Sequence, residues 1–282
     1  MRVLVYNQKG GCGKTTTAIN LGAALARLGD EVVTLVDLDP QTHLTAALGR
    51  RVDGSTWTVT QWLAGDPGSA LPVCERLFLV PGDCEAEEPR TFANPLAAVE
   101  GIVLIDAPPV WSVTVARLMA ECDVILTPLE PDFLGMQGFN RLLQTMKKHG
   151  APWSRLRILI CRYVDRLAIH REVRERLGQL FPSGTLLPVV IRNSVRLAEA
   201  PGFGRHIFDH APESTGARDY EAAARLLLEE WRMTASAQRA AAWRPRLETE
   251  KRGHDDEKSV GQASRRAAAQ RPLGLGRGFS AG

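Results

Sequence analysis

Residues 9–16 carry the side chains of this sequence that are best suited to binding phosphate. They read Lys9-Gly10-Gly11-Cys12-Gly13-Lys14-Thr15-Thr16, directly after the apolar run Val3–Tyr6 and directly before the helical pattern Thr17–Leu25. A strand, a glycine-rich turn and a helix in this order form the context in which a loop can surround a phosphate group. Glycines let backbone N–H groups converge on one point, and the helix start adds free N–H groups and partial positive charge. The sequence therefore predicts a nucleotide-binding loop over residues 9–16.

Two side chains of this loop have the chemistry that a nucleoside triphosphate requires. The ammonium group of Lys14 would reach the β- and γ-phosphates, and the hydroxyl of Thr15 would ligate Mg²⁺. The loop also departs from the ordinary pattern, because Gln8 stands where a first glycine is usual and Lys9 adds a second lysine before the glycine pair. The spacing alone leaves open whether Lys9 acts on the nucleotide or is an ordinary surface lysine.

Three carboxylates follow predicted strands. Asp106 ends the apolar run Gly101–Ile105, which would place its carboxylate near the Mg²⁺ ion, usually through water. Asp37 and Asp39 follow the strand predicted at Glu31–Val36, and a spacing of two puts both on one side of an extended chain. A helix N-cap or turn role remains open for Asp106, and a solvated-turn role remains open for Asp37 and Asp39.

Apolar runs alternate with helical patterns along the chain. Strands are predicted at Val3–Tyr6, Glu31–Val36, Leu77–Val80, Gly101–Ile105, Val124–Pro128, Leu156–Ile160 and Leu186–Ile191. Helices after the first are predicted at Gly138–Lys148, His170–Phe181 and Ala217–Arg232. This alternation predicts an α/β fold with a doubly wound, mainly parallel sheet and helices on both faces. Ligands of such sheets bind at the carboxyl ends of the strands, where every candidate residue above falls.

Several segments resemble the ParA/MinD family of ATPases, and within it the ParA/Soj-type partitioning ATPases. The loop with its early lysine, Asp37-Leu38-Asp39-Pro40-Gln41 and Asp106-Ala107-Pro108-Pro109 are similar to the family's phosphate-binding loop and its two switch segments. Further similar segments are 123–128, 135–138 and 191–204, so that the resemblance covers about residues 1–232.

The resemblance implies a slow ATPase that works with ATP and Mg²⁺ as a sandwich homodimer. Lys9 would reach the nucleotide of the second subunit, and Asp39 would position the attacking water. The implied catalytic residues are Lys9, Lys14 and Asp39, and the implied metal residues are Thr15, Asp37 and Asp106. The resemblance also implies that the ATP-bound dimer binds double-stranded DNA without sequence preference and that a ParB-type partner stimulates hydrolysis.

Four arginines are candidates for the DNA contact. Sequence-independent binding needs cations that neutralise phosphates and no readout of bases. Ordinary surface ion pairs remain an alternative role for these side chains. The candidates are Arg192, Arg196, Arg205 and Arg218.

Length and charge indicate one α/β domain with a tail. The chain has 282 residues and a formal net charge of +3, and residues 235–282 hold ten Lys and Arg against five Asp and Glu. Because the tail offers few side chains to bury, we expect an ATPase domain over residues 1–234 and a basic, disordered tail over 235–282. Within the tail, residues 273–280 resemble a stretch near the start of ParB proteins. Residues 81–106 form a shorter segment than we expect for the family.

Cysteines and hydropathy set the expected compartment. Five widely spaced cysteines without a Cys-x-x-Cys pair favour a reducing cytosol over disulfides or a zinc site. Cys12 lies beside the loop amides, which would lower its pKa if they stabilised the thiolate. No signal peptide or membrane span is predicted. We therefore expect a cytoplasmic protein, associated with the nucleoid in its ATP state and without a membrane partner.

Three other functions were compared with this one. A MinD-like ATPase needs a terminal amphipathic helix, and the apolar residues of 273–279 are sparse and interrupted by glycine. An iron–sulfur reductase similar to the nitrogenase iron protein would need paired cysteines near the dimer axis, and no cysteine closely follows Asp106. An ATP-dependent amidase or ligase would need a further substrate domain. A MinD-like or cargo-positioning ATPase that acts on a membrane or a protein assembly stays open as the alternative.

Overall fold

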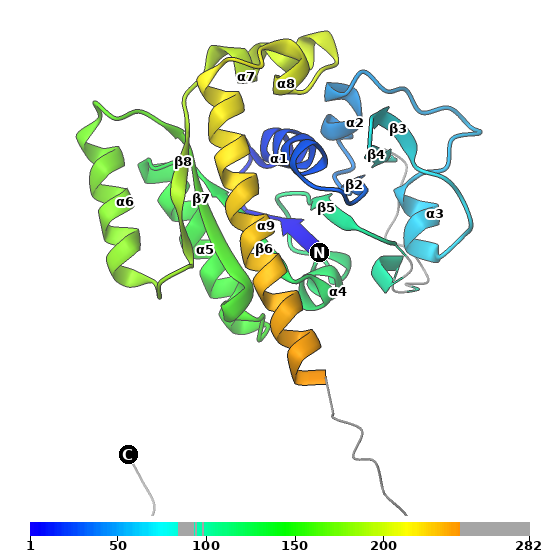
Figure 1. Cartoon of the computed structure of the whole chain (residues 1–282). Coiled ribbons are helices and arrows are strands. Elements are labelled where there is room, and N and C mark those ends of the chain that lie inside the picture. Colours follow the sequence, from blue (N-terminus) through cyan, green and yellow to red (C-terminus); the bar gives the residue numbers. More distant parts are fainter. Residues whose placement is uncertain (84–92, 94, 98, 243–282) are drawn as a thin grey trace, which may run out of the picture. The chain divides into compact units, whose positions relative to one another are not determined.

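The computed structural model describes residues 1–83, 93, 95–97 and 99–242. The described residues of Met1–Ala240 form one compact unit around a sheet of eight strands (Figure 1). The strands are β1 (Arg2–Val5), β2 (Val33–Asp37), β3 (Leu71–Cys74), β4 (Leu77–Val80), β5 (Ile102–Asp106), β6 (Val124–Leu129), β7 (Leu156–Tyr163) and β8 (Leu186–Arg192). Their order is β3-β4-β2-β5-β1-β6-β7-β8, and every neighbouring pair is parallel except β3 with β4.

Helices cover both faces of this sheet. The core on one face is built with α1 (Lys14–Leu28), α2 (His43–Ala47), α7 (Val195–Glu199), α8 (Ile207–His210) and α9 (Thr215–Ala242). The core on the other face is built with α3 (Val59–Ala64), α4 (Val113–Glu121), α5 (Phe133–Lys148) and α6 (Ala168–Leu180). Short 3₁₀ turns occupy η1 (Pro95–Ala97), η2 (Trp153–Arg155) and η3 (Ala200–Phe203). The predicted doubly wound, mainly parallel sheet with helices on both faces is confirmed.

The central strand shows why its sequence is apolar throughout. Side chains of a strand alternate between the two faces of the sheet. Val3 and Val5 accordingly belong to one core, and Leu4 and Tyr6 to the other. A strand buried on both faces therefore needs a continuous apolar run, as the sequence of β1 has.

One edge of the sheet differs from the sequence-based expectation. Strand β3 was not predicted, and it pairs antiparallel with β4 through a turn in which Arg76 has φ 59°. It is four residues long and contains Pro72, which removes a backbone donor and suits an edge strand. The helices α2, α3, α4, α7 and α8 were also not predicted. They are too short to establish a clear helical period in the sequence.

The predicted boundary between residues 234 and 235 falls within α9, which continues to Ala242. The rest of the predicted tail, including residues 273–280, lies outside the described residues. Within the segment that seemed short for the family, residues 84–92, 94 and 98 also lie outside them. In the described part of the chain, no helix is long and apolar enough to cross a membrane.

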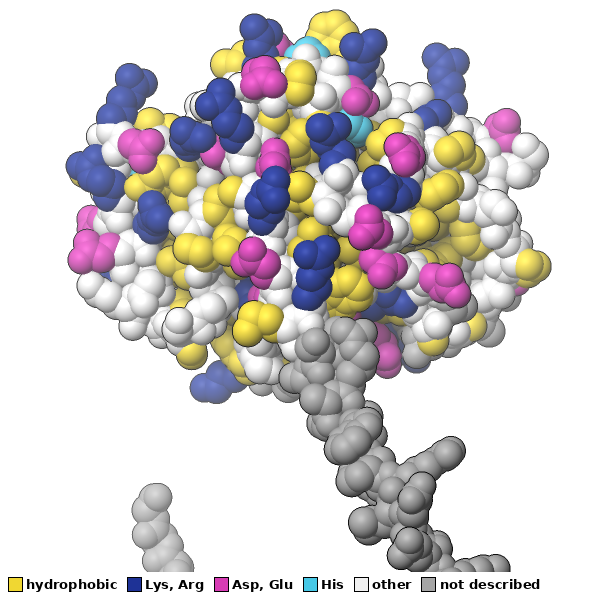
Figure 2. Space-filling view, viewed as in Figure 1, with side chains coloured by type: hydrophobic (Ala, Val, Ile, Leu, Met, Phe, Trp, Pro, Cys, Tyr) yellow, Lys and Arg dark blue, Asp and Glu magenta, His cyan; other side chains and the backbone are white. Residues whose placement is uncertain are grey.

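The face that carries α9 has a mixed charge. Lys and Arg side chains alternate there with Asp and Glu, and apolar patches separate them (Figure 2). No large area of a single sign is visible on this face.

The parallel register brings three strand ends to one level. Val5 of β1 is paired with Asp106 of β5, and Asp106 is paired with Asp37 of β2. The loops that follow these three strands therefore start side by side at the carboxyl edge of the sheet.

Candidate nucleotide site

The loop after β1 turns directly into α1. Gly11 and Gly13 have φ 73° and 93°, a left-handed conformation that glycine adopts without strain, and α1 begins at Lys14. The buried Lys14 ammonium donates to the backbone oxygen of Lys9 at 3.2 Å. The lysine thus lies inside its own loop, next to the free N–H groups at the start of a 15-residue helix. Gly10, Cys12, Thr15 and Thr16 complete this segment.

Cys12 of the loop is packed inside the protein. Its side chain is fully buried, and the thiol donates to the Lys9 backbone oxygen at 3.3 Å. Burial raises the pKa of the Cys12 thiol, and the nearby Lys14 charge only partly opposes this effect. Desolvation of the thiolate outweighs its attraction to the cation, so the loop does not lower the pKa of this thiol.

Thr15 and Asp106 join the loop to the neighbouring strand. The Thr15 hydroxyl donates to Oδ2 of Asp106 at 2.7 Å. Asp106 is 1% exposed, and its Oδ1 has no hydrogen-bond partner among the described residues. Burial raises the pKa of Asp106 to about 7, while the hydrogen bond from Thr15 acts in the opposite direction.

These oxygens suit a Mg²⁺ ion. Mg²⁺ prefers oxygen ligands and usually takes one or two protein groups together with phosphate oxygens and water. The described residues contain no group of three His, Cys, Asp or Glu side chains that could hold a metal on its own. A hydroxyl and a carboxylate beside a phosphate-binding loop therefore fit a nucleotide-bound Mg²⁺ better than a metal site formed by the protein alone.

Asp37 is buried next to Asp106 and supports α2. Its Oδ2 accepts from the backbone N and the Oγ1 of Thr45, at 2.8 and 2.6 Å, and the Gly82 backbone N donates to the same Thr45 hydroxyl at 2.9 Å. A Cβ at Gly82 would lie 2.9 Å from Cγ of Asp37, so only glycine fits there. Oδ1 has no partner among the described residues, and burial raises the pKa of Asp37 to about 6. One oxygen of this predicted metal residue, Oδ2, therefore holds Thr45 of α2 in place. The sequence did not indicate this structural function.

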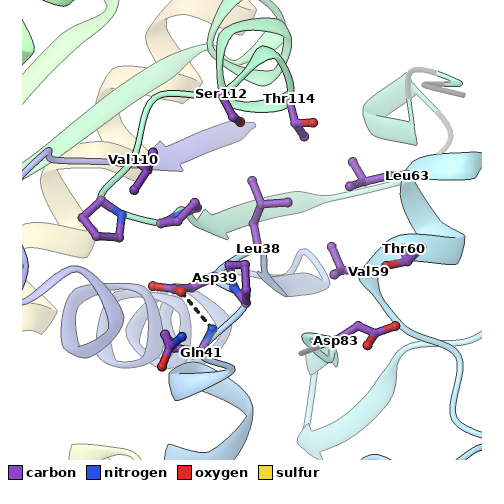
Figure 3. Close-up of a pocket in the computed structure, with 13 residues that line it drawn as sticks. Leu38, Asp39, Gln41, Val59, Thr60, Leu63, Asp83, Val110, Ser112 and Thr114 are labelled. Atoms are coloured by element: carbon purple, nitrogen blue, oxygen red, sulfur yellow. Dashed lines mark hydrogen bonds between the residues drawn. The ribbon is translucent and has the colours of Figure 1, made fainter. Parts of the chain in front are cut away.

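Asp39 lies at the mouth of a cleft. Its Oδ1 accepts from the Gln41 backbone N at 3.0 Å (Figure 3). The cleft has a volume of about 390 Å³ and lies between residues 38–41, α3 and the segment 108–114. Much of its wall is apolar, with side chains such as Leu63 and Val110, and its polar residues include Asp39, Asp83 and Thr114.

Lys9 is bound within its own chain. Its Nζ is 3.1 Å from Oδ1 of Asp132 and 3.7 Å from Oε2 of Glu130, both in the segment between β6 and α5. The predicted role in a second subunit therefore requires a change of partner.

A second cavity, which the sequence did not indicate, lies beside the loop. It has a volume of about 410 Å³ and is bounded by Gly13, Thr16 and the carboxyl ends of β7 and β8. Asn193 and Val164 are among its lining residues, and Arg162 at its wall has φ 53°, a strained value for a side chain of this size. Its size and its place beside the loop suit the base of a nucleotide. The predicted strand ends near residues 160 and 191 were the signal that could have located it.

Two of the predicted DNA-contacting arginines form ion pairs. Arg192 donates to Asp219 through its backbone N at 2.9 Å and through Nη2 at 2.5 Å. Arg196 lies 2.9 Å from Glu199 on the same short helix. Neighbouring carboxylates therefore offset the charges of both.

The other two arginines keep their charge available. Arg205 and Arg218 are exposed. Arg218 donates to the backbone oxygen of Glu213 at 2.7 Å, which fixes the guanidinium without neutralising it. These two are the better placed of the four for contact with phosphate.

Comparisons with known proteins show the family of the chain. Residues 3–207 match the family model described as the CobQ/CobB/MinD/ParA nucleotide binding domain. The chain is 38% identical over 234 residues to the chromosome-partitioning ATPase Soj of Thermus thermophilus, covering 78% of this chain and 92% of that protein. It is 32% identical over 248 residues to the chromosome partitioning protein ParA of Myxococcus xanthus, covering 80% and 87%.

A solved structure has a similar fold. Cobyrinic acid a,c-diamide synthase from Mycobacterium smegmatis, with bound ADP and magnesium, superposes with a TM-score of 0.62 at 27% identity, over 82% of this chain and 95% of that one. The family match, over residues 3–207, spans the loop, Asp39 and Asp106. The chain therefore belongs to the ParA/MinD family of nucleotide-binding ATPases.

Proposed function

We propose that this protein is a partitioning ATPase that pairs with a second copy when it binds ATP. In that state it binds DNA without sequence preference and, with a ParB-type activator, moves a chromosome or plasmid. The observation that carries the proposal is the hydrogen bond between Thr15 and Asp106 beside the Lys14 loop. It brings together the hydroxyl, carboxylate and ammonium groups that Mg²⁺-dependent phosphoryl transfer uses. The partitioning ATPases among its relatives support this function.

In the proposed reaction ATP and water give ADP and phosphate. Lys14 leaves the Lys9 backbone oxygen and contacts the β- and γ-phosphates, while Asp39 accepts a hydrogen bond from the attacking water and orients it. Thr15 and Asp106 would hold a Mg²⁺ ion, which would supply positive charge to the phosphate oxygens. Lys9 neutralises charge on the nucleotide of the second copy. Turnover is slow because one carboxylate activates water weakly.

Exposed apolar side chains support pairing through the carboxyl edge of the sheet. Val110 is 64% exposed after β5, Phe133 is 73% exposed after β6, and Val195 is 71% exposed after β8. Parallel strands end at the same edge, so these side chains lie along the edge of the sheet that carries the nucleotide site. Apolar groups gathered around one site are typical of a surface that another protein covers. A symmetric pair would cover both copies of this surface at once.

DNA binding in the ATP state would rest on cations that the pair presents twice. Arg205 and Arg218 are the exposed candidates, and Arg192 and Arg196 would add less because carboxylates partly neutralise them. Binding through phosphates alone is weak for one copy and strengthens when two copies act together. We accordingly place the protein in the cytoplasm and, with ATP, on the nucleoid.

The test is DNA co-sedimentation with nonspecific duplex at two salt concentrations. The wild-type protein is compared with ATP and with ADP, and Asp39→Ala with ATP. We expect binding with ATP only, weakening as salt rises, and more persistent binding for Asp39→Ala because its ATP is not hydrolysed. Asp66→Ala serves as the matched control, since Asp66 is an exposed carboxylate outside the site. It should behave as wild type.

Two outcomes would contradict the proposal. Equal binding with ATP and ADP would remove the nucleotide switch. Absence of DNA binding in every nucleotide state would favour the MinD-like or cargo-positioning alternative, which flotation with liposomes and ATP would then examine.

A further inference from the structure

The Lys9 side chain lies against the start of α5 in its own chain. Its ammonium is closest to Asp132, at 3.1 Å, and the more distant Glu130 is shared with Arg162 at 3.5 Å. The Lys9 side chain is only 19% exposed. A lysine that must act on another molecule is thus bound and largely covered in the single chain.

Two glycines make this contact possible. A Cβ at Gly138 of α5 would lie 2.7 Å from Cβ of Lys9, and a Cβ at Gly135 would lie 1.9 Å from the backbone oxygen of Glu130. Neither distance is compatible with a side chain. The loop therefore packs closely against α5, with no room for a side chain between them at Gly138. A lysine that moved freely at the surface would not require such close packing.

Asp132 has two separable functions. Its Oδ1 accepts from the Gly135 backbone N at 2.5 Å and so caps α5, and the same carboxylate pairs with Lys9. The next two residues, Phe133 and Leu134, are 73% and 59% exposed and belong to the apolar surface proposed for pairing. Asp132 therefore contacts the lysine and directly precedes two residues that a second copy would cover.

We propose that Asp132 is a positioning residue that retains Lys9 in its own chain until a second, nucleotide-bound copy takes the ammonium over. This inference rests on the proposed function, in which Lys9 acts on the nucleotide of the second copy. Reaching that phosphate takes the ammonium away from α5. Each pairing event then breaks one Lys9–Asp132 contact in each chain, so the cost enters the pairing equilibrium twice.

The substitution Asp132→Asn separates the two functions. Asparagine caps helices as well as aspartate does but carries no charge for Lys9. A partly exposed ion pair is worth up to about fivefold in an equilibrium constant. Two contacts per pair then predict a dissociation constant that is lower by up to ~25-fold. Sedimentation velocity over a range of protein concentrations, with the ATP analogue AMPPNP and Mg²⁺, measures it.

Two further variants test whether charge at this position is responsible. Glu221→Gln removes one carboxylate from an exposed ion pair with Arg225 on α9, with the same change in net charge, and should pair as wild type does. Glu130→Gln should strengthen pairing less than Asp132→Asn, because Glu130 is farther from Lys9 and shared with Arg162. It also answers the question if Asp132→Asn does not fold.

Different results would contradict the positioning role of Asp132 and the proposed action of Lys9 on a second copy. If wild type pairs with AMPPNP and neither Asp132→Asn nor Glu130→Gln pairs more tightly, the positioning role of Asp132 is overturned and the proposed pairing stands. If Lys9→Ala pairs as tightly as wild type, or if no variant pairs at all, the proposed action of Lys9 on a second copy is itself overturned, and the inference falls with it.

Discussion

Burial and metal binding make opposite demands on the carboxyl group of Asp106. Burial raises its pKa to about 7, and the aligned Asp37 has a pKa of about 6. Both values lie above the reference value of 3.8. The ligand-free protein therefore holds protons on these carboxyl groups near neutral pH. A Mg²⁺ ion bound there would have to displace them, since only the charged carboxylate attracts the cation.

This gives a prediction for the pH dependence of stability. Because folding raises both pKa values, the folded chain binds more protons than the unfolded chain between about pH 4 and pH 7. The free energy of unfolding should therefore fall as pH rises through the folded pKa values. From pH 6 to pH 8 we expect Asp106 to contribute a loss of about 1 kcal/mol. Urea unfolding of the ligand-free protein at both values measures it.

Asp106→Asn is the control for this prediction, because an amide keeps an acceptor for Thr15 but does not titrate. The variant should lose less stability than wild type between pH 6 and pH 8. The same loss in both proteins would show that other groups cause the dependence.

At the scale of elements, α9 is attached to the sheet close to the nucleotide site. Asp219 near its start accepts from Arg192 at the end of β8, and the next residue, Tyr220, shares a hydrogen bond of 3.1 Å with Thr17 of α1. The helix thus connects the last strand with the helix that follows the phosphate-binding loop. Arg192 accordingly has a structural role, in addition to being a candidate for DNA contact.

We predict that Arg192→Ala destabilises the protein by about 1–2 kcal/mol. The Asp219 side chain is only 9% exposed and would be left without its cation, although the 42% exposure of Arg192 reduces the cost. Urea unfolding measures the loss, and Arg192→Lys should recover part of it. Arg205→Ala should leave stability unchanged and weaken DNA binding. The opposite pattern for these two arginines would reverse their assigned roles.

At the scale of the whole molecule, charge is unevenly divided along the chain. Residues 243–282 hold nine Lys and Arg against five Asp and Glu, although the full chain carries a net charge of only +3. The remaining residues therefore carry a net charge of −1. Nonspecific attraction to DNA would then depend on local cations of the described part together with the tail.

We predict that truncation after Ala242 weakens ATP-dependent DNA binding and reduces its dependence on salt. Fewer cations release fewer counterions from DNA, so the slope of log affinity against log salt should become shallower. Titration of labelled duplex at several salt concentrations measures the slope, and AMPPNP affinity serves as the control because the loop and Asp106 are retained. An unchanged slope would exclude the tail from the DNA contact.

Much of the fold and the centre of the site could be predicted from local sequence. The loop over residues 9–16 is recognisable because its glycines, lysine and hydroxyls lie within one strand–turn–helix unit. Asp106 was found because it ends a fully apolar strand. The parallel sheet followed from the alternation of such strands with helices. Short elements such as β3 and α2 escaped, since four or five residues do not establish a period.

The partners of the functional side chains were decided by the tertiary structure alone. Lys9 meets Asp132 across 123 positions of the sequence, and Asp37 holds Thr45 in a helix that was not predicted. The order of the strands sets these contacts, because it determines which loops become neighbours at the carboxyl edge. The sequence by itself determined which groups can do the chemistry, since residue type and local spacing are enough for that. Only the folded chain decided which carboxylate holds each cation, because burial and distance exist only once the distant segments are packed together.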